Sequence, residues 1–391
     1  MAEELTYVII TPHSLHKSRT GGIISRLLSR TGLELVAARM FAPSKELIEE
    51  YAKLIVSPKD PQDPRVQELI REYLLKEVMP DPKTGRRRRV MVLILKGEDA
   101  VRRTRDVVGN FKLEGEAGLT IRDTYGDLVF DEQGNVRYFE PAVLCPPTSE
   151  EAEQKLKLWA RYSDTDGGVL KGVIEYPPGA KVERTLVLIK PENFQVPSGK
   201  PGNMIDYFSR TGLYIIGIKV HRMSVRQAEE FYGPVREALK TKLNHIIMER
   251  AAPVLEKEFE FKISEAGMKK IAEVLAPEFG EDQFQRIIRF MCGRTRMDCP
   301  PEELDKPGTE KCIALVYEGV DAVRKIREVL GPTDPKKAPP GSIRREFGRD
   351  VMVNAAHASD SVENAEREMR IINIEENNFR KVVEDFYGSL N

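Results

Sequence analysis

A histidine in the C-terminal third of the chain lies just before a pattern typical of a helix start. It is His357, in the segment N-A-A-H-A-S-D-S-V-E-N-A-E-R-E-M. Asp360 and Glu363 have the D-x-x-E spacing of a capping box, which predicts a helix beginning near Ser361. Glu368 lies two turns further on, so its carboxylate can return to the helix start, orient the imidazole and stabilise its cation. Helix N-termini also bind phosphate. The segment therefore suits phosphoryl transfer, although a capped surface helix after an ordinary histidine fits the spacing equally well.

Three cationic residues elsewhere in the second half of the chain favour the phosphoryl-transfer interpretation. Lys190 ends an apolar run, Arg327 lies on a predicted helix, and Arg344 follows the Pro-Pro-Gly turn at 339–341. Each alone is more typical of a solvated surface charge. Arginine, however, binds two phosphate oxygens at once, and phosphoryl transfer depends mainly on positioning and charge neutralisation. Together with His357 they suggest a nucleotide substrate.

The elements that must position these residues occur twice along the chain. Five pairs of similar segments follow the same order: VIITP and VLIKP (8–12, 187–191), SRTGL twice (29–33, 209–213), GEDAVR and GVDAVR (97–102, 319–324), an arginine and a glycine after each (Arg105 and Gly109, Arg327 and Gly331), and TIR and SIR (120–122, 342–344). Five ordered matches indicate an internal duplication. The offset between copies grows from about 180 to about 222, so the second copy carries an insertion of about 42 residues.

Each copy alternates apolar runs with amphipathic helices, which predicts an α/β (α+β) sandwich. The predicted strands are 7–10, 35–38 and 90–95 in the first copy and 186–189, 214–220 and 312–317 in the second. Helices are predicted at 22–29 and 203–209 and from about Asp99 and Asp321 onward.

The duplication also predicts the domain organisation. A first domain would span 1–160, a Gly- and Pro-containing linker 161–182, and a second domain 183–391 with its insertion at about 233–308. The insertion is helical and charged in character; a lid, an interaction surface and a subdomain without function remain open. About nine extra residues near 127–141 in the first copy have the pattern of a β-hairpin.

Composition limits the other function classes. The net charge of −1 removes a chain-wide electrostatic case for nucleic acid, and the basic run at 86–89 is more typical of a solvated loop. No apolar run approaches the ~18 residues of a membrane span. The four cysteines have no C-x-x-C spacing and the five histidines form no metal-ligand pair. We therefore expect a reduced, cytoplasmic protein without a protein-bound metal.

The second copy resembles the nucleoside diphosphate kinase family. The signature of that family around its active-site histidine, N-x-x-H-x-S-D-S, stands here from Asn354 to Ser361, and the resemblance covers about 183–232, 284–291 and 309–375. It implies two tandem ferredoxin-like sandwiches with a helical insertion in the second. It also implies catalytic roles for His357, Glu368, Lys190, Tyr232 and Ser359, and nucleotide contacts for Lys190, Arg327, Thr333, Arg344, Asn354 and Phe284.

The first copy departs from the pattern of the family at most of these positions. In register with the second copy, Thr11 replaces Lys190, Leu144 replaces His357, Pro141 replaces Asn354, Lys155 replaces Glu368 and Phe111 replaces Thr333, while Tyr51, Arg105 and Arg122 remain. A leucine cannot accept a phosphoryl group. The first copy is thus expected to be a pseudo-domain, serving as an interface or as a nucleotide-binding regulator. In the second copy Ala358 replaces a glycine, and the insertion falls near Phe284, so base preference is not predicted.

The resemblance implies a transferase reaction of the ping-pong type. A nucleoside triphosphate would phosphorylate His357, and a nucleoside diphosphate would then take the phosphate. Mg²⁺ would be held through the nucleotide phosphates rather than by protein ligands, and family members associate, so a homo-oligomer is expected. Two alternatives remain: a nucleotide-binding regulatory or scaffold protein with little turnover, and a phosphohistidine relay to a protein acceptor.

Overall fold

The computed structural model describes residues 3–111 and 119–390 of the chain. They form two compact units. The sandwich unit comprises Met1–Val220 and Cys312–Asn391 and contains both copies, and the hairpin unit comprises His221–Lys311.

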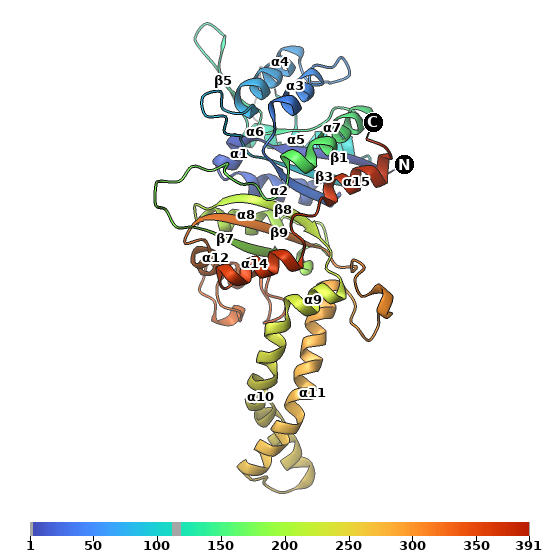
Figure 1. Cartoon of the computed structure of the whole chain (residues 1–391), viewed down its shortest axis with the longest axis vertical. Coiled ribbons are helices and arrows are strands. Elements are labelled where there is room, and N and C mark those ends of the chain that lie inside the picture. The colour runs from blue at the N-terminus through green and yellow to red at the C-terminus, as the bar shows by residue number, and fades with distance from the viewer. Residues whose placement is uncertain (1–2, 112–118, 391) are drawn as a thin grey trace. The chain divides into compact units, whose positions relative to one another are not determined.

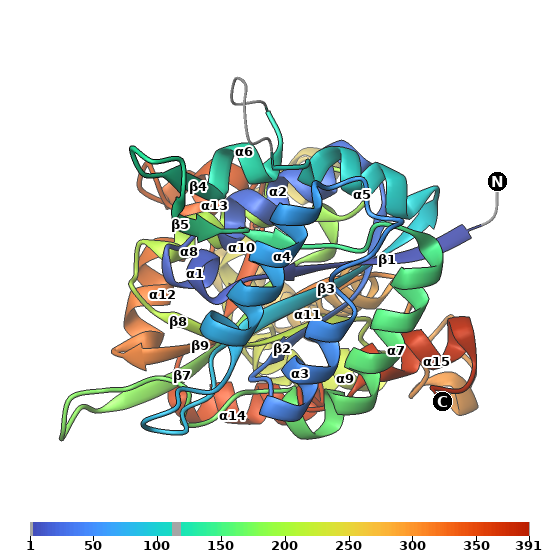
Figure 2. The ribbon, with the colours of Figure 1, turned by 90° about the horizontal axis from the view of Figure 1, so that it is seen from above.

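The first copy is built on a four-stranded antiparallel sheet of order β2-β3-β1-β6, of which Figure 1 labels β1 and β3. Its strands are β1 (Glu3–Ile10), β2 (Glu34–Phe41), β3 (Val90–Glu98) and β6 (Val143–Leu144). Its helices are α1 (Pro12–His16), α2 (Thr20–Thr31), α3 (Lys45–Lys53), α4 (Pro64–Tyr73), α5 (Ala100–Val108), α6 (Ile121–Tyr125) and α7 (Ser149–Asp166). Helices α3, α4 and α7 lie over one side of this sheet (Figure 2). The predicted hairpin is present as β4 (Asp127–Phe130) and β5 (Val136–Glu140).

The second copy repeats this plan, with the sheet order β8-β9-β7-β10. Its strands are β7 (Val182–Ile189), β8 (Tyr214–His221), β9 (Cys312–Val320) and β10 (Ala356–Ala358). Its helices are α8 (Lys200–Ser209), α12 (Ala322–Leu330), α13 (Ile343–Phe347) and α14 (Val362–Ile371), and α15 (Asn378–Tyr387) follows. The strands form because their residues are apolar and buried almost throughout. The predicted pair of tandem sandwiches is confirmed.

Strand register identifies equivalent residues in the two copies. Leu144 on β6 lies opposite Ile9 on β1, and His357 on β10 lies opposite Leu188 on β7. Ile9 and Leu188 are equivalent in the sequence repeat, so Leu144 occupies the place of His357. The prediction that a leucine replaces the histidine in the first copy is therefore confirmed.

Backbone conformations recur at the same places. Asp99 and Asp321, just before α5 and α12, have φ of 53° and 57°, and Ala142 and Ala355 have φ of 57° and 73°. Such left-handed conformations are uncommon for residues other than glycine. Their recurrence indicates that the duplication preserved local structure as well as sequence.

The two copies contact each other through α2 and α8 (Figure 1). The contact depends on small residues, because a Cβ at Gly202 would lie 2.3 Å from the carbonyl oxygen of Gly21. Helix α15 adds a second contact, in which Phe379 and Val383 join the hydrophobic core of the first copy. The Phe379 ring lies 5.4 Å from that of Phe41. The last helix of the chain thus completes the core of its first domain.

The hairpin unit consists mainly of two long antiparallel helices. They are α10 (Gly233–Phe259) and α11 (Glu265–Cys292), preceded by α9 (Val225–Phe231). Leu243 and Ile247 of α10 form a small buried cluster with Ala272 and Ala276 of α11. This unit is the helical insertion predicted from the sequence.

Two connecting segments differ in detail from what the sequence predicts. Helix α7 continues to Asp166, into the stretch expected to be a linker, because Ser163 and Asp166 are buried and glycine first appears at Gly167. The basic run at 86–89 lies in a loop, as expected, but two of its arginines also make specific contacts. Its Arg87 pairs with Asp166 at 3.0 Å, and its Arg89 guanidinium stacks 5.1 Å from the Tyr214 ring of the second copy.

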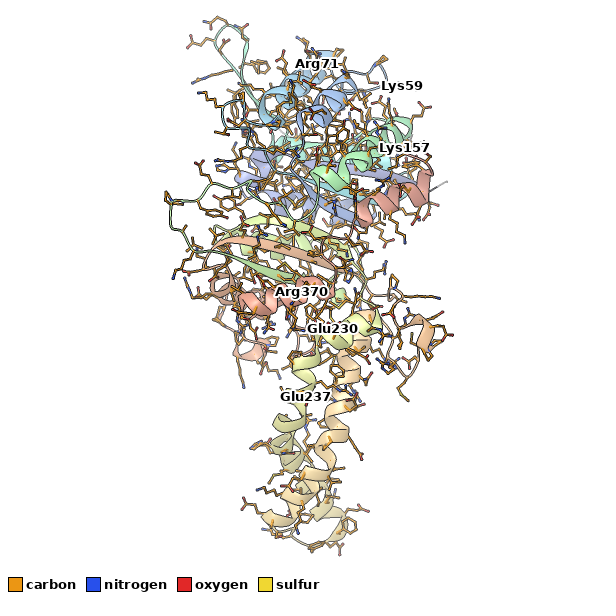
Figure 3. The ribbon with its side chains drawn as sticks, viewed as in Figure 1. Lys59, Arg71, Lys157, Glu230, Glu237 and Arg370 are labelled. Atoms are coloured by element: carbon orange, nitrogen blue, oxygen red, sulfur yellow. The ribbon has the colours of Figure 1, made fainter. Side chains whose placement is uncertain are left out.

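Charged side chains cover the outside of the sandwich unit, for example Arg71 on α4 and Arg370 on α14 (Figure 3). Within residues 3–111 and 119–390, every helix is too short or too polar to cross a bilayer.

Candidate active site

His357 lies at the centre of the three-residue edge strand β10, in a partly buried position with 22% of its side chain exposed. The chain then turns into α14, whose N-cap is Ser361; its hydroxyl accepts from the Asn364 amide at 3.0 Å. The predicted helix start is therefore right, but the Asp360–Glu363 capping box was wrong. A serine one residue later already caps the helix, and Asp360 binds the Asn364 side chain instead, at 2.6 Å.

Glu368 on α14 holds the histidine ring. Its Oε2 lies 2.9 Å from His357 Nε2 and accepts the Ser359 hydroxyl at 2.6 Å. Both Glu368 and Ser359 are buried. A carboxylate at Nε2 favours the tautomer that has a proton on that nitrogen and a lone pair on Nδ1. The contact expected from the helical spacing is thus present.

Lys190 and Asn354 form a second group. Lys190 ends β7 and is buried; its Nζ donates to Asn354 Oδ1 at 2.7 Å and to the Met352 carbonyl at 3.0 Å. Asn354 Nδ2 in turn donates to the Thr333 carbonyl at 3.1 Å. Burial lowers the pKa of Lys190 to about 8, so this lysine loses its charge at a lower pH than an exposed lysine does.

Two arginines approach the same loop from α12 and α13. Arg344 donates to the carbonyls of Gly331, at 3.0 Å, and Ala356, at 3.2 Å, which ties it to the strand of His357. Arg327 is exposed and lines a surface hollow with Gly331, Pro332 and Asp360. Two guanidinium groups near Gly331 make this region suited to an anion with several phosphates.

Glu192 and Asn193 also belong to this group, although the sequence reasoning missed them. Glu192 Oε1 accepts the Ala355 amide at 2.9 Å, and Asn193 Nδ2 donates to the Ala355 carbonyl at 2.9 Å. The Lys190 amide donates to the same carbonyl at 3.0 Å. Ala355, in its left-handed conformation, is thus held on both sides. The only signal in the sequence was their position directly after Lys190.

The remaining two candidates, Tyr232 and Phe284, lie in the hairpin unit. Tyr232 is buried at the end of α9. Phe284 is fully buried on α11, with the Arg236 guanidinium 5.1 Å from the centre of its ring. A ring that stacks on a base needs an exposed face, so the expectation that Phe284 binds the base is wrong. Phe284 lies on the buried face of α11 with Ile288 and Met291, so it is a core residue.

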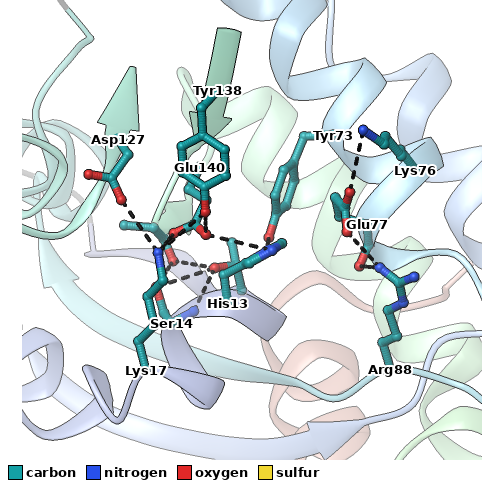
Figure 4. Close-up of polar contacts among 12 residues, drawn as sticks. His13, Ser14, Lys17, Tyr73, Lys76, Glu77, Arg88, Asp127, Tyr138 and Glu140 are labelled. Atoms are coloured by element: carbon teal, nitrogen blue, oxygen red, sulfur yellow. Dashed lines mark hydrogen bonds and ion pairs between the residues drawn. The ribbon is translucent and has the colours of Figure 1, made fainter. Parts of the chain in front are cut away.

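The equivalent region of the first copy is filled by its own side chains (Figure 4). His13, at the place of Glu192, has Nδ1 2.8 Å from the Tyr73 hydroxyl. The buried carboxylate of Glu140 lies 2.7 Å from Lys17 and 3.6 Å from His13, and it accepts the Tyr138 hydroxyl. These polar groups satisfy one another, and Thr11 and Leu144 stand at the places of the lysine and the histidine of the second copy.

The arginines retained in the first copy are occupied as well. Arg122 is buried with its guanidinium 5.4 Å from the centre of the Phe111 ring, and Arg105 pairs with Asp60 at 2.8 Å. Lys155, at the place of Glu368, pairs with Glu151 at 2.6 Å. Arg122 donates to the carbonyls of Gly109 and Val143 much as Arg344 donates to those of Gly331 and Ala356, so a regulatory nucleotide on Arg105 and Arg122 stays a prediction.

The sandwich fold and the histidine–glutamate pair beside buried cations are of the nucleoside diphosphate kinase type. The family profile described as "Nucleoside diphosphate kinase" matches residues 183–256 and 303–377. A nucleoside diphosphate kinase of Staphylothermus marinus is 31% identical over 49% of this chain and 92% of its own length. One of Aquifex aeolicus is 29% identical, over 49% and 94%. A solved structure of an NDP kinase from Pyrobaculum aerophilum is 26% identical over 49% of this chain and 94% of its own, with a TM-score of 0.35. The chain belongs to the nucleoside diphosphate kinase family.

Proposed function

We propose that the second copy is a nucleoside diphosphate kinase that works through a phosphohistidine at His357. The observation that carries this proposal is the contact of Glu368 with His357 Nε2. It directs the Nδ1 lone pair to the phosphorus atom and stabilises the positive charge that the ring gains when the N–P bond forms.

The reaction would have two balanced halves. In the first, Nδ1 of His357 attacks the terminal phosphorus of a nucleoside triphosphate; the N–P bond forms, the P–O bond breaks, and the electron pair leaves with the nucleoside diphosphate. In the second, a terminal oxygen of another nucleoside diphosphate attacks the same phosphorus, and the histidine nitrogen leaves. Both halves depend on positioning and on charge neutralisation rather than on further covalent chemistry.

The cationic residues would divide this neutralisation between them. Lys190, Arg344 and Thr333 lie around the 331–333 loop and would hold the terminal phosphates, with Asn354 fixing the position of Lys190. Arg327 lies further out on the surface hollow and would act on the phosphates nearer the nucleoside. Ser359 would hold Glu368 in its orientation through their 2.6 Å hydrogen bond.

Mg²⁺ would enter with the nucleotide. Within the described ranges, no group of three or more His, Cys, Asp or Glu side chains is arranged to hold a metal ion, and a Mg²⁺ that keeps its phosphate and water ligands needs none. Asp360 is exposed and lines the same hollow as Arg327, so its carboxylate is placed to accept hydrogen bonds from metal-bound water. The ion would neutralise phosphate charge.

Steady-state kinetics test this proposal. The purified chain, supplied with ATP, GDP and Mg²⁺, should form GTP, and double-reciprocal plots at several GDP concentrations should be parallel, as a covalent intermediate requires. Intersecting lines would contradict the phosphohistidine mechanism. Nucleotide binding without turnover would instead support the regulatory or scaffold alternative.

A further inference from the structure

Glu192 has a buried carboxylate oxygen whose role the mechanism above does not explain. Its Oε1 accepts the Ala355 amide at 2.9 Å. Its Oε2 is buried and has no hydrogen-bond partner among the residues that the structure describes. Burial raises the pKa of this carboxyl group, so an ionised Glu192 costs free energy unless a positive charge is near.

The first copy serves as an internal comparison for the contacts around Ala355. The carbonyl of Ala355 accepts from Asn193, and the carbonyl of the equivalent Ala142 accepts from Ser14, at 2.9 Å and 2.8 Å. Both alanines have positive φ. A side-chain donor to this carbonyl is therefore also present in the copy that lacks the histidine. We attribute this hydrogen bond to the requirements of the fold rather than to catalysis.

The carboxylate contact does not recur. His13 stands at the place of Glu192, and its ring contacts Tyr73 and Glu140 instead. Ala142 keeps its left-handed conformation, with φ of 57°, all the same. The backbone turn thus forms without a carboxylate, which is present only in the copy that carries the active-site histidine.

Lys190 is linked to the same residue, because its backbone amide donates to the Ala355 carbonyl at 3.0 Å while the Ala355 amide donates to Glu192. Three charged groups act on it: Glu192 and Asp350 favour its cation, and Arg344 opposes it, with Glu192 the strongest of the three. Burial lowers the pKa of Lys190 to about 8 in spite of them. Without Glu192 the lysine would lose its proton at a lower pH.

We propose that Glu192 is a positioning residue of the phosphoryl-transfer site, which binds the Ala355 amide beside His357 with one carboxylate oxygen and keeps Lys190 cationic with its charge. The proposal rests on the proposed function of the second copy. In this role Glu192 acts through Ala355 and Lys190 and does not itself contact the transferred phosphate.

Glu192→Gln separates the two parts of this role, because glutamine can still accept the Ala355 amide but carries no charge. The pH dependence of kcat/KM reports the free enzyme, and the active form of Lys190 is protonated, so activity falls as pH rises through its pKa. Loss of a neighbouring opposite charge lowers that pKa by about one unit. From a pKa of about 8, kcat/KM should fall about fivefold at pH 8 and only about 1.1-fold at pH 6.

Glu192→Ala also removes the bond to the Ala355 amide and should lose about fivefold even at pH 6. Glu132→Gln, at an exposed turn of the β4–β5 hairpin, is the matched control and should follow the wild-type profile. Suppose that the wild type turns over but the Glu192→Gln profile either matches the wild-type profile or is lowered equally at every pH. Either result would overturn the proposal for Glu192 and leave the proposed function standing. A wild type without turnover would overturn the proposed function itself.

Discussion

Replacement of Glu368 by glutamine tests the geometry of the histidine most sharply. Glu368 Oε2 accepts from both His357 Nε2, at 2.9 Å, and Ser359, at 2.6 Å, and the carboxylate is buried. Glutamine has nearly the same shape but cannot stabilise a positive ring. A hydrogen bond to a charged group contributes about 1.5–3 kcal/mol, so the rate of His357 phosphorylation should fall about 10- to 150-fold.

The assay is a rapid-quench single turnover with γ-labelled ATP at saturating concentration. Nucleotide affinity should change little, because Glu368 reaches the nucleotide only through His357. Glu366→Gln, at an exposed position of the same helix α14, is the matched control and should stay within twofold of the wild type. A folded Glu368→Gln variant that also stays within twofold would refute the role given to this carboxylate.

Other predictions follow from the contrast between the two copies and from their contact. Leu144→His restores a histidine in the first copy but not its partners, since Lys155 and Thr11 remain. After incubation with γ-labelled ATP, the protein should therefore still carry one labelled phosphate per chain. Two labelled phosphates per chain would contradict the account. Phe379→Ala removes a fully buried ring from the core of the first copy and should lower the free energy of unfolding by about 3–5 kcal/mol. A urea titration followed by tryptophan fluorescence of Trp159, 5.0 Å from Phe41, measures it; a loss below 1 kcal/mol would show that α15 does not stabilise the first copy.

The sequence predicted the parts of this structure that repeat. The match of Ala152 with Ala365 predicted the equivalence of Leu144 and His357, and the match of VIITP with VLIKP aligned the strands opposite them, because strand register is set by local alternation of side chains. The helical spacing from Ser361 to Glu368 likewise predicted which carboxylate meets the imidazole, since that contact is within one short segment.

What the sequence did not predict depends on tertiary contacts. Nothing local distinguishes Glu192 from a surface carboxylate, and its role appears only when β10 is placed beside β7. In the sequence Arg89 is one of four consecutive arginines in a loop, and its contact with the Tyr214 ring is visible only in the folded structure. Phe284 looked available as a base platform because sequence alone cannot tell a buried ring on a long helix from an exposed one.

The central claim is a covalent phosphate on His357, and trapping tests it most directly. The purified chain is incubated with γ-labelled ATP and Mg²⁺, quenched in alkali, and compared with His357→Ala; a parallel sample is chased with GDP. The account predicts one alkali-stable, acid-labile label per chain that is absent from the variant and passes to GDP. Label that persists in His357→Ala, or no label on a folded wild type that binds nucleotide, would contradict it.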